Sequence, residues 1–181
     1  MSTLTVTGAS QGAQTVNEAV LESLRTAKLQ GWNVLHLAGK DHAAAVRQGY
    51  RDLGIPAVVI DFTPAMADVW AVTDLAVARA GASTCTELTA CGIASVLMPY
   101  PFHKDMHQRA NAQALVNAHA AVLIDDAKDR RINAQRLQPA LTSLLYDAAK
   151  RRAMADAARS LGRRDAADAV ATEVAALAGL A

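Results

Sequence analysis

Residues 75–92 read Leu-Ala-Val-Ala-Arg-Ala-Gly-Ala-Ser-Thr-Cys-Thr-Glu-Leu-Thr-Ala-Cys-Gly, and this order predicts a strand, a tight turn and a helix. The apolar run at its start is typical of a buried parallel strand. Gly81 lies where the backbone must turn sharply. Thr84 can cap a helix, and Glu87 follows three residues later, as a capping box requires. Gly92 stands where the helix would end.

The predicted helix start would face outward at the carboxyl end of a strand. Unpaired backbone N–H groups and the helix dipole favour an anion at such a place. In open α/β sheets, ligands bind at this edge. Glu87 therefore has two interpretations: its carboxylate only closes the capping box, or it accepts hydrogen bonds from both hydroxyls of a ribose. The stretch alone leaves both open.

The composition indicates a domain-sized chain without a strong overall charge. Its 181 residues suffice for a full core. The 18 Lys and Arg residues stand against 17 Asp and Glu residues, which argues against a nucleic-acid partner held by overall charge. Two cysteines are too few for a disulfide framework, so a reducing cytoplasm is expected. Residues 88–102 are uncharged but too short and too broken to span a bilayer, so any membrane contact is expected to be peripheral.

Strand-like and helix-like segments alternate along the chain with short connections. Strands are expected at residues 4–7, 33–38, 57–62, 75–78, 94–98 and 121–124. Helices are expected at residues 15–29, 41–53, 84–91, 106–118, 133–146, 148–161 and 165–180, with a short one opened by Thr63 as cap and Pro64. This alternation predicts an α/β fold with a Rossmann-like, doubly wound parallel sheet of six strands. Residues 1–181 are expected to form one domain, including the C-terminal helices from about residue 133, and a central strand at residue 4 implies an absent upstream domain.

Three loops are expected to meet at the carboxyl edge of this sheet, at residues 8–12, 81–84 and 99–108. Their glycines, hydroxyl residues and helix starts suit a diphosphate, which backbone N–H groups can hold without a metal. The first loop lacks the third glycine of a dinucleotide fingerprint and the Gly-Lys-Ser/Thr of a P-loop. His103 and His107 are four residues apart, but no third ligand is evident, so no metal is expected. His107 and Gln108 offer N–H groups suited to a sugar.

Three motifs carry a resemblance to a known family. Residues 8–13 read Gly-Ala-Ser-Gln-Gly-Ala, residues 79–87 read Arg-Ala-Gly-Ala-Ser-Thr-Cys-Thr-Glu, and residues 103–112 read His-Lys-Asp-Met-His-Gln-Arg-Ala-Asn-Ala. In this order and spacing they resemble the carboxyl-terminal, donor-binding half of the MurG-type GT-B glycosyltransferases. The resemblance covers nearly the whole chain.

The resemblance implies a function for the full-length protein. It would move N-acetylglucosamine from UDP-N-acetylglucosamine to a lipid-linked N-acetylmuramyl pentapeptide in peptidoglycan synthesis, inverting the anomeric centre and using neither metal nor cofactor. The enzyme would lie in the cytoplasm, peripheral to the cytoplasmic face of the inner membrane. The acceptor site and the catalytic base would belong to the absent amino-terminal half. This chain would then contain no catalytic residue and be inactive alone.

The resemblance also assigns roles to positions of this sequence. Glu87 would hold the ribose hydroxyls, and the backbone near Thr63 would meet the uracil. Ser10 and the backbone of residues 82–84 would bind the diphosphate, and His107 with Gln108 would contact the N-acetylglucosamine. The substrate-binding residues are thus expected to be Ser10, Gln11, Gly12, Thr63, Ala82, Ser83, Thr84, Glu87, His107 and Gln108. Two departures from the family pattern are Ala9, where a second glycine is usual, and His107, where a glutamine also occurs.

Two other functions stay open from the sequence. One is another UDP-sugar enzyme of the same fold, such as a glycolipid galactosyltransferase or a UDP-N-acetylglucosamine 2-epimerase. The other is a non-catalytic nucleotide-binding module, which would show no sugar preference beyond UDP. A dinucleotide dehydrogenase is disfavoured because the G-x-G-x-x-G fingerprint is missing.

Overall fold

A single parallel sheet of six strands organises the molecule. The computed structural model describes residues 1–8, 13–101 and 106–179. The sheet has the strand order β3-β2-β1-β4-β5-β6, with every neighbouring pair parallel. The strands are β1 Ser2–Thr7, β2 Trp32–Leu37, β3 Val58–Ile60, β4 Leu75–Ala78, β5 Ala94–Leu97 and β6 Ala121–Leu123. The order reverses between β1 and β4, which confirms the predicted Rossmann-like, doubly wound α/β fold.

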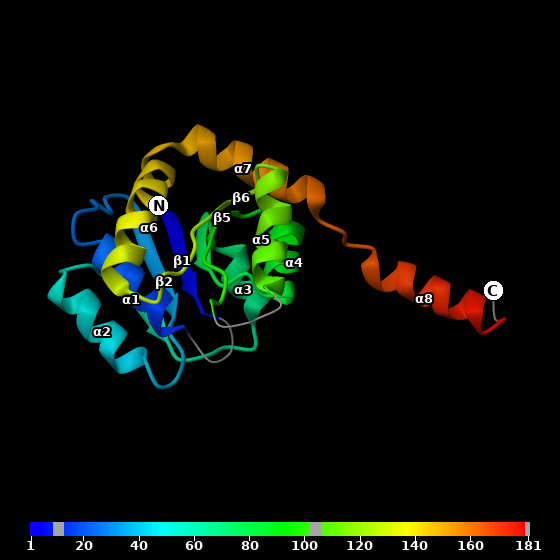
Figure 1. Cartoon of the computed structure of the whole chain (residues 1–181), viewed down its shortest axis with the longest axis horizontal. Coiled ribbons are helices and arrows are strands. Elements are labelled where there is room, and N and C mark those ends of the chain that lie inside the picture. The colour runs from blue at the N-terminus through cyan, green and yellow to red at the C-terminus, as the bar shows by residue number, and fades with distance from the viewer. Residues whose placement is uncertain (9–12, 102–105, 180–181) are drawn as a thin grey trace.

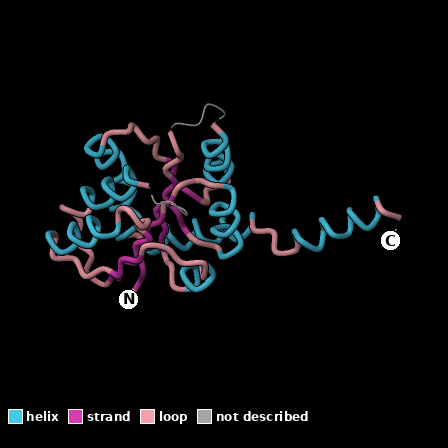
Figure 2. The backbone as a smooth tube through the Cα atoms, turned by 90° about the horizontal axis from the view of Figure 1, so that it is seen from below, coloured by secondary structure: helices cyan, strands magenta, loops and turns pink. Residues whose placement is uncertain are grey.

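Helices cover both faces of the sheet (Figures 1 and 2). They are α1 Gln14–Ser23, α2 Ala43–Asp52, α3 Met66–Ala71, α4 Ala82–Cys91, α5 His107–Asn117, α6 Arg130–Tyr146, α7 Ala148–Leu161 and α8 Ala166–Leu177. One core joins the sheet to α1, α2 and α6, and the other joins it to α3, α4 and α5. These two layers flank the sheet, and ligands of open α/β sheets bind at the carboxyl edge between such layers.

Strand β4 shows how the sequence divides between the two cores. All four of its residues are buried. Leu75 and Val77 belong to the core under α1 and α6, whereas Ala76 and Ala78 belong to the core under α3 and α4. Side chains of a strand alternate between faces, so the large residues face one core and the small alanines face the other.

Two predicted helix caps are wrong. Helix α4 begins at Ala82 with extended Gly81 as its N-cap, and no side chain caps it, so Thr84 lies in the first turn instead of at the cap. Helix α3 begins at Met66 with Ala65 as N-cap. Thr63 Oγ1 accepts a hydrogen bond from Ala65 N at 3.1 Å, which makes a local turn before the helix.

The ends of other elements also differ from the prediction. Helix α1 stops at Ser23, six residues before the predicted end at residue 29, and Gly31, with φ +83°, directly precedes β2. Gly92 ends α4 with φ +67°, as predicted. Helix α8 extends away from the sheet (Figure 1), and none of its residues is buried. The assignment of residues 1–181 to one domain stays a prediction.

Candidate functional site

A pocket of about 340 Å³ opens at the carboxyl edge of the sheet. Thr7 and Leu37, at the ends of β1 and β2, line it. Its walls are the segment from Asp61 to Met66 and, from α4, the residues Ser83, Thr84 and Glu87. The pocket therefore lies beside the strand-order reversal, where open α/β sheets bind ligands.

Four residues predicted to bind substrate line this pocket: Thr63, Ser83, Thr84 and Glu87. They come from two segments about twenty residues apart, which the crossing from β3 through α3 and β4 brings face to face. Ala82 is exposed at the beginning of the same helix. Three further predicted residues, Ser10, Gln11 and Gly12, lie outside the described residues.

The amino terminus of α4 supplies the hydrogen-bond donors of the pocket. Cys85 N donates to Gly81 O at 2.9 Å. The amides of Ala82, Ser83 and Thr84 precede this bond and have no acceptor within the helix. The helix dipole adds partial positive charge at the same place. This end of α4 can thus stabilise an anionic group without a metal.

Glu87 does not close a capping box, and that interpretation is wrong. Its Oε2 accepts a hydrogen bond from Trp70 Nε1 at 2.7 Å. The carboxylate is half-buried and lines the pocket. A carboxylate has about four acceptor positions, so one indole bond leaves room for further donors. The ribose-binding role of Glu87 stays a prediction that this geometry permits.

His107 and Gln108 lie elsewhere on the carboxyl edge and are not among the residues that line the pocket. They begin α5, whose N-cap Met106 has φ 53°. Gln108 Oε1 accepts a hydrogen bond from Tyr100 N at 2.9 Å, which ties the helix start to the segment after β5. Their predicted contact with the sugar stays a prediction.

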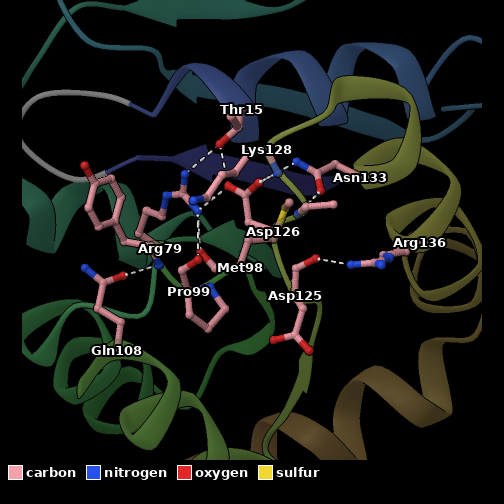
Figure 3. Close-up of polar contacts among 12 residues, drawn as sticks. Thr15, Arg79, Met98, Pro99, Gln108, Asp125, Asp126, Lys128, Asn133 and Arg136 are labelled. Carbon is pink, nitrogen blue, oxygen red and sulfur yellow. Dashed lines mark hydrogen bonds and ion pairs between the residues drawn. The ribbon is translucent and has the colours of Figure 1, made fainter. Parts of the chain in front are cut away.

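A buried ion pair beside this edge was not predicted from the sequence. Arg79 follows β4, and its Nη1 lies 2.8 Å from Asp126 Oδ2 (Figure 3). The same Nη1 donates to the carbonyls of Met98 and Pro99, at 2.9 and 3.0 Å. Thr15 in α1 completes the group, since its hydroxyl accepts from Arg79 Nη2 at 2.6 Å and donates to Asp126 at 2.5 Å. The pair thus joins the ends of β4 and β5, the segment after β6 and the beginning of α1.

Further donors surround the Asp126 carboxylate. Asn133 Nδ2 and Lys128 N donate to its Oδ1 at 2.7 and 2.8 Å (Figure 3). Burial raises the pKa of Asp126, but the hydrogen bonds from Thr15, Asn133, Lys128 and Arg79 outweigh it and leave the pKa below its usual value. Burial lowers the pKa of Arg79, against the opposing effect of Asp126. The sequence does contain a signal for this ion pair. Arg79 and Asp126 follow the predicted strands at 75–78 and 121–124, and the ends of parallel strands meet at one edge of a sheet.

Other candidate chemistry is limited within the part of the chain that the structure describes. No three His, Cys, Asp or Glu side chains there gather in a group that could hold a metal. None of the described helices is long and apolar enough to cross a membrane. The expectation that the site needs no metal and no cofactor stays a prediction.

Comparison with known proteins decides the family. Residues 3–170 match the model described as the glycosyltransferase family 28 C-terminal domain. The chain belongs to glycosyltransferase family 28. The family 28 match thus extends over all six strands apart from Ser2.

Two relatives of this family 28 chain carry the name UDP-N-acetylglucosamine--N-acetylmuramyl-(pentapeptide) pyrophosphoryl-undecaprenol N-acetylglucosamine transferase. The Sorangium cellulosum protein is 41% identical over 179 residues, which are 97% of this chain and 44% of the relative. The Xanthomonas campestris protein (strain B100) is 43% identical over 168 residues, 93% of this chain and 39% of the relative. The chain thus spans less than half the length of these relatives.

Solved structures agree with this assignment. Acinetobacter baumannii MurG superposes with a TM-score of 0.80 and 28% identity, over 93% of this chain and 50% of that one. Staphylococcus aureus MnaA, solved with UDP, gives a TM-score of 0.73 at 12% identity, over 99% of this chain and 47% of that one. The second likeness concerns the fold alone. The fold is therefore that of one half of a MurG structure, and the predicted resemblance to MurG-type enzymes is confirmed.

Proposed function

We propose that this chain is the donor-binding half of a glycosyltransferase. The full-length protein would move N-acetylglucosamine from UDP-N-acetylglucosamine to a lipid-linked N-acetylmuramyl pentapeptide, in peptidoglycan synthesis. The names of the family 28 relatives support this reaction. The lipid acceptor would be held by the other half of the protein, and the enzyme would sit at the cytoplasmic face of the inner membrane.

One observation carries the proposal: the start of α4 and Glu87 belong to the same pocket wall. Ala82 and Glu87 are five positions apart, which is about 7.5 Å along a helix axis. A diphosphate against the helix start and a ribose against Glu87 can thus belong to one nucleotide. Thr63, on the opposite wall, would then face the uracil.

The reaction needs stabilisation of the leaving group. Negative charge accumulates on UDP as the bond between sugar and phosphate breaks. The amides of Ala82, Ser83 and Thr84 are fixed by the helix before the reaction begins, so they can stabilise that charge without reorganising. No base for the acceptor hydroxyl is assigned to this chain, so we expect it to transfer no sugar alone. We also expect the isolated chain to bind UDP weakly.

A binding panel tests the proposal. Calorimetric titration of the chain with UDP-N-acetylglucosamine, UDP-glucose, UDP-galactose and UDP, in a chelating buffer, should rank UDP-N-acetylglucosamine first. Preference for another UDP-sugar would indicate a different enzyme of this fold. Equal affinity for every UDP compound would indicate a nucleotide-binding module. No binding of UDP, or turnover by the isolated chain, would contradict the proposal.

A further inference from the structure

Trp70 of α3 has a single polar atom, and that atom is bound to the predicted ribose-binding residue. The residue is 3% exposed and belongs to the core beneath α3 and α4, together with Leu88 and Ala78. Its Nε1 donates to Glu87 Oε2 at 2.7 Å. A buried indole N–H usually has a partner, and its ring is fixed by packing. The donor therefore has a defined place and direction.

Glu87 is less restrained without this bond. It lies in the middle of α4, half-buried and facing the pocket. A glutamate side chain has several rotatable bonds, and fixing them on ligand binding opposes affinity. A fixed indole donor selects one carboxylate orientation before the ligand arrives. It occupies one acceptor position and leaves others for two hydroxyl groups.

The bond also connects the two walls of the pocket. Trp70 is four residues after Met66, and Met66 and Thr63 line the wall opposite Glu87. Helix α3 is a short helix of 6 residues. The indole bond thus joins it directly to α4, so both walls share one polar link.

We propose that Trp70 is a positioning residue for the Glu87 carboxylate, holding it in the orientation that accepts the ribose hydroxyls of a uridine nucleotide. This inference rests on the proposed function, since it presumes a ribose at Glu87. A role in packing alone would make Trp70 matter equally for ligands with and without ribose hydroxyls. A positioning role makes it matter only for ligands that carry them.

The test compares UDP with 2′,3′-dideoxyuridine diphosphate by calorimetry on the full chain. Trp70→Phe retains an aromatic ring and removes the donor, and it should weaken UDP binding about tenfold while leaving the dideoxy compound unchanged. In a Glu87→Ala background, Trp70→Phe should have no further effect on UDP. Equal weakening of both ligands, or an undiminished effect in the Glu87→Ala background, overturns the inference.

Trp32→Phe is the matched control. Its indole Nε1 donates to Leu145 O at 3.2 Å, at the amino end of the sheet, far from the pocket along β2. This variant should bind both ligands as the wild type does. If Glu87→Ala abolishes the preference for UDP over the dideoxy compound and Trp70→Phe leaves that preference unchanged, the positioning role fails while the proposed function stands. If the wild type has no such preference, the ribose role of Glu87 itself fails.

Nuclear magnetic resonance supplies a second readout if Trp70→Phe does not fold. The two indole N–H signals of the chain are assigned through Trp32→Phe. UDP should shift the Trp70 signal more than the dideoxy compound does, because ribose hydroxyls share the same carboxylate. Equal shifts from the two compounds would overturn the inference.

Discussion

Arg79 and Asp126 form an ion pair with Nη1 and Oδ2 2.8 Å apart, and their side chains are only 6% and 0% exposed. Three strand ends and one helix start meet at this pair. The Arg79 guanidinium also lies 5.6 Å from the centre of the Tyr100 ring. Since Tyr100 N donates to Gln108, the pair supports the segment that carries the predicted sugar-binding residues.

Replacing Arg79 by Met should strongly destabilise the chain. The substitution keeps most of the side-chain volume but leaves the Asp126 carboxylate buried without its cation. Breaking a buried pair from one side typically lowers the free energy of unfolding by about 3–5 kcal/mol. Urea denaturation followed by circular dichroism measures the loss.

Arg109→Met is the control for this experiment. Arg109 pairs with Asp125, one residue before Asp126, but both side chains are substantially exposed. Exposed pairs contribute about 0–1 kcal/mol. Similar losses for Arg79→Met and Arg109→Met would show that burial of the first pair has no energetic consequence.

His36 should make the chain sensitive to acid. Its ring bridges Tyr50 and Asn17 at 2.9 and 3.0 Å, and burial lowers its pKa from 6.5 to about 3. The unfolded chain takes up a proton below pH 6.5 and the folded chain does not, so stability is full above that pH and falls towards pH 3. The slope attributable to one proton is about 1.4 kcal/mol per pH unit.

His36→Gln, which can still donate and accept, should remove about that slope. Urea denaturation between pH 7 and pH 4 measures this slope. Asp126 acts in a different pH range: its pKa is lowered, so its contribution to the free energy of unfolding is lost only as the pH falls below about 4. Parallel stability curves for wild type and His36→Gln between pH 6 and 4 would contradict the buried neutral histidine.

The alternation of segments was enough to predict the sheet, because each strand and helix has a recognisable pattern in its own stretch of sequence. The apolar run at 75–78, for example, lies between Asp74 and Arg79 and is typical of a short buried strand. The chemistry at the edge was harder to predict. Arg79 and Asp126 are separated in the sequence by α4, β5, α5 and β6, and no local pattern couples them.

Glu87 illustrates the same limit. The spacing of Thr84 and Glu87 matches a capping box, yet the helix starts two residues before Thr84, since extended Gly81 already turns the chain into it. The carboxylate is then free to pair with an indole from another helix. Trp70 lies seventeen positions before Glu87, and the chain passes through β4 to bring the two together. This tertiary contact, and not the local spacing, decides what Glu87 binds.

Glu87→Gln should separate the ribose from the rest of the nucleotide. The amide keeps the shape of the side chain but replaces one acceptor oxygen with a donor, so two hydroxyls cannot both be accepted as before. UDP affinity should fall about tenfold, as for loss of one hydrogen bond to a charged group. Uracil affinity should stay unchanged. Calorimetry with both compounds checks this, and equal UDP affinity for wild type and variant would remove the ribose role.

Ala82→Pro should remove a single hydrogen-bond donor to the diphosphate without disturbing α4. Proline suits the first position of a helix, and Gly81, with φ −63° and ψ 151°, already has the backbone that a residue before proline adopts. The variant lacks one amide N–H at the helix start. We expect UDP to bind about five- to tenfold more weakly, in line with one charge-assisted hydrogen bond, and uridine to bind as before.

Ala82→Gly, which retains the amide, controls for loss of the methyl group and should bind UDP nearly as well as the wild type. Because the dipole and the remaining amides persist, binding should be weakened but not abolished. Unchanged UDP affinity in Ala82→Pro would place the diphosphate away from this helix end, and an equal loss for uridine would indicate distortion of the pocket instead of loss of a donor.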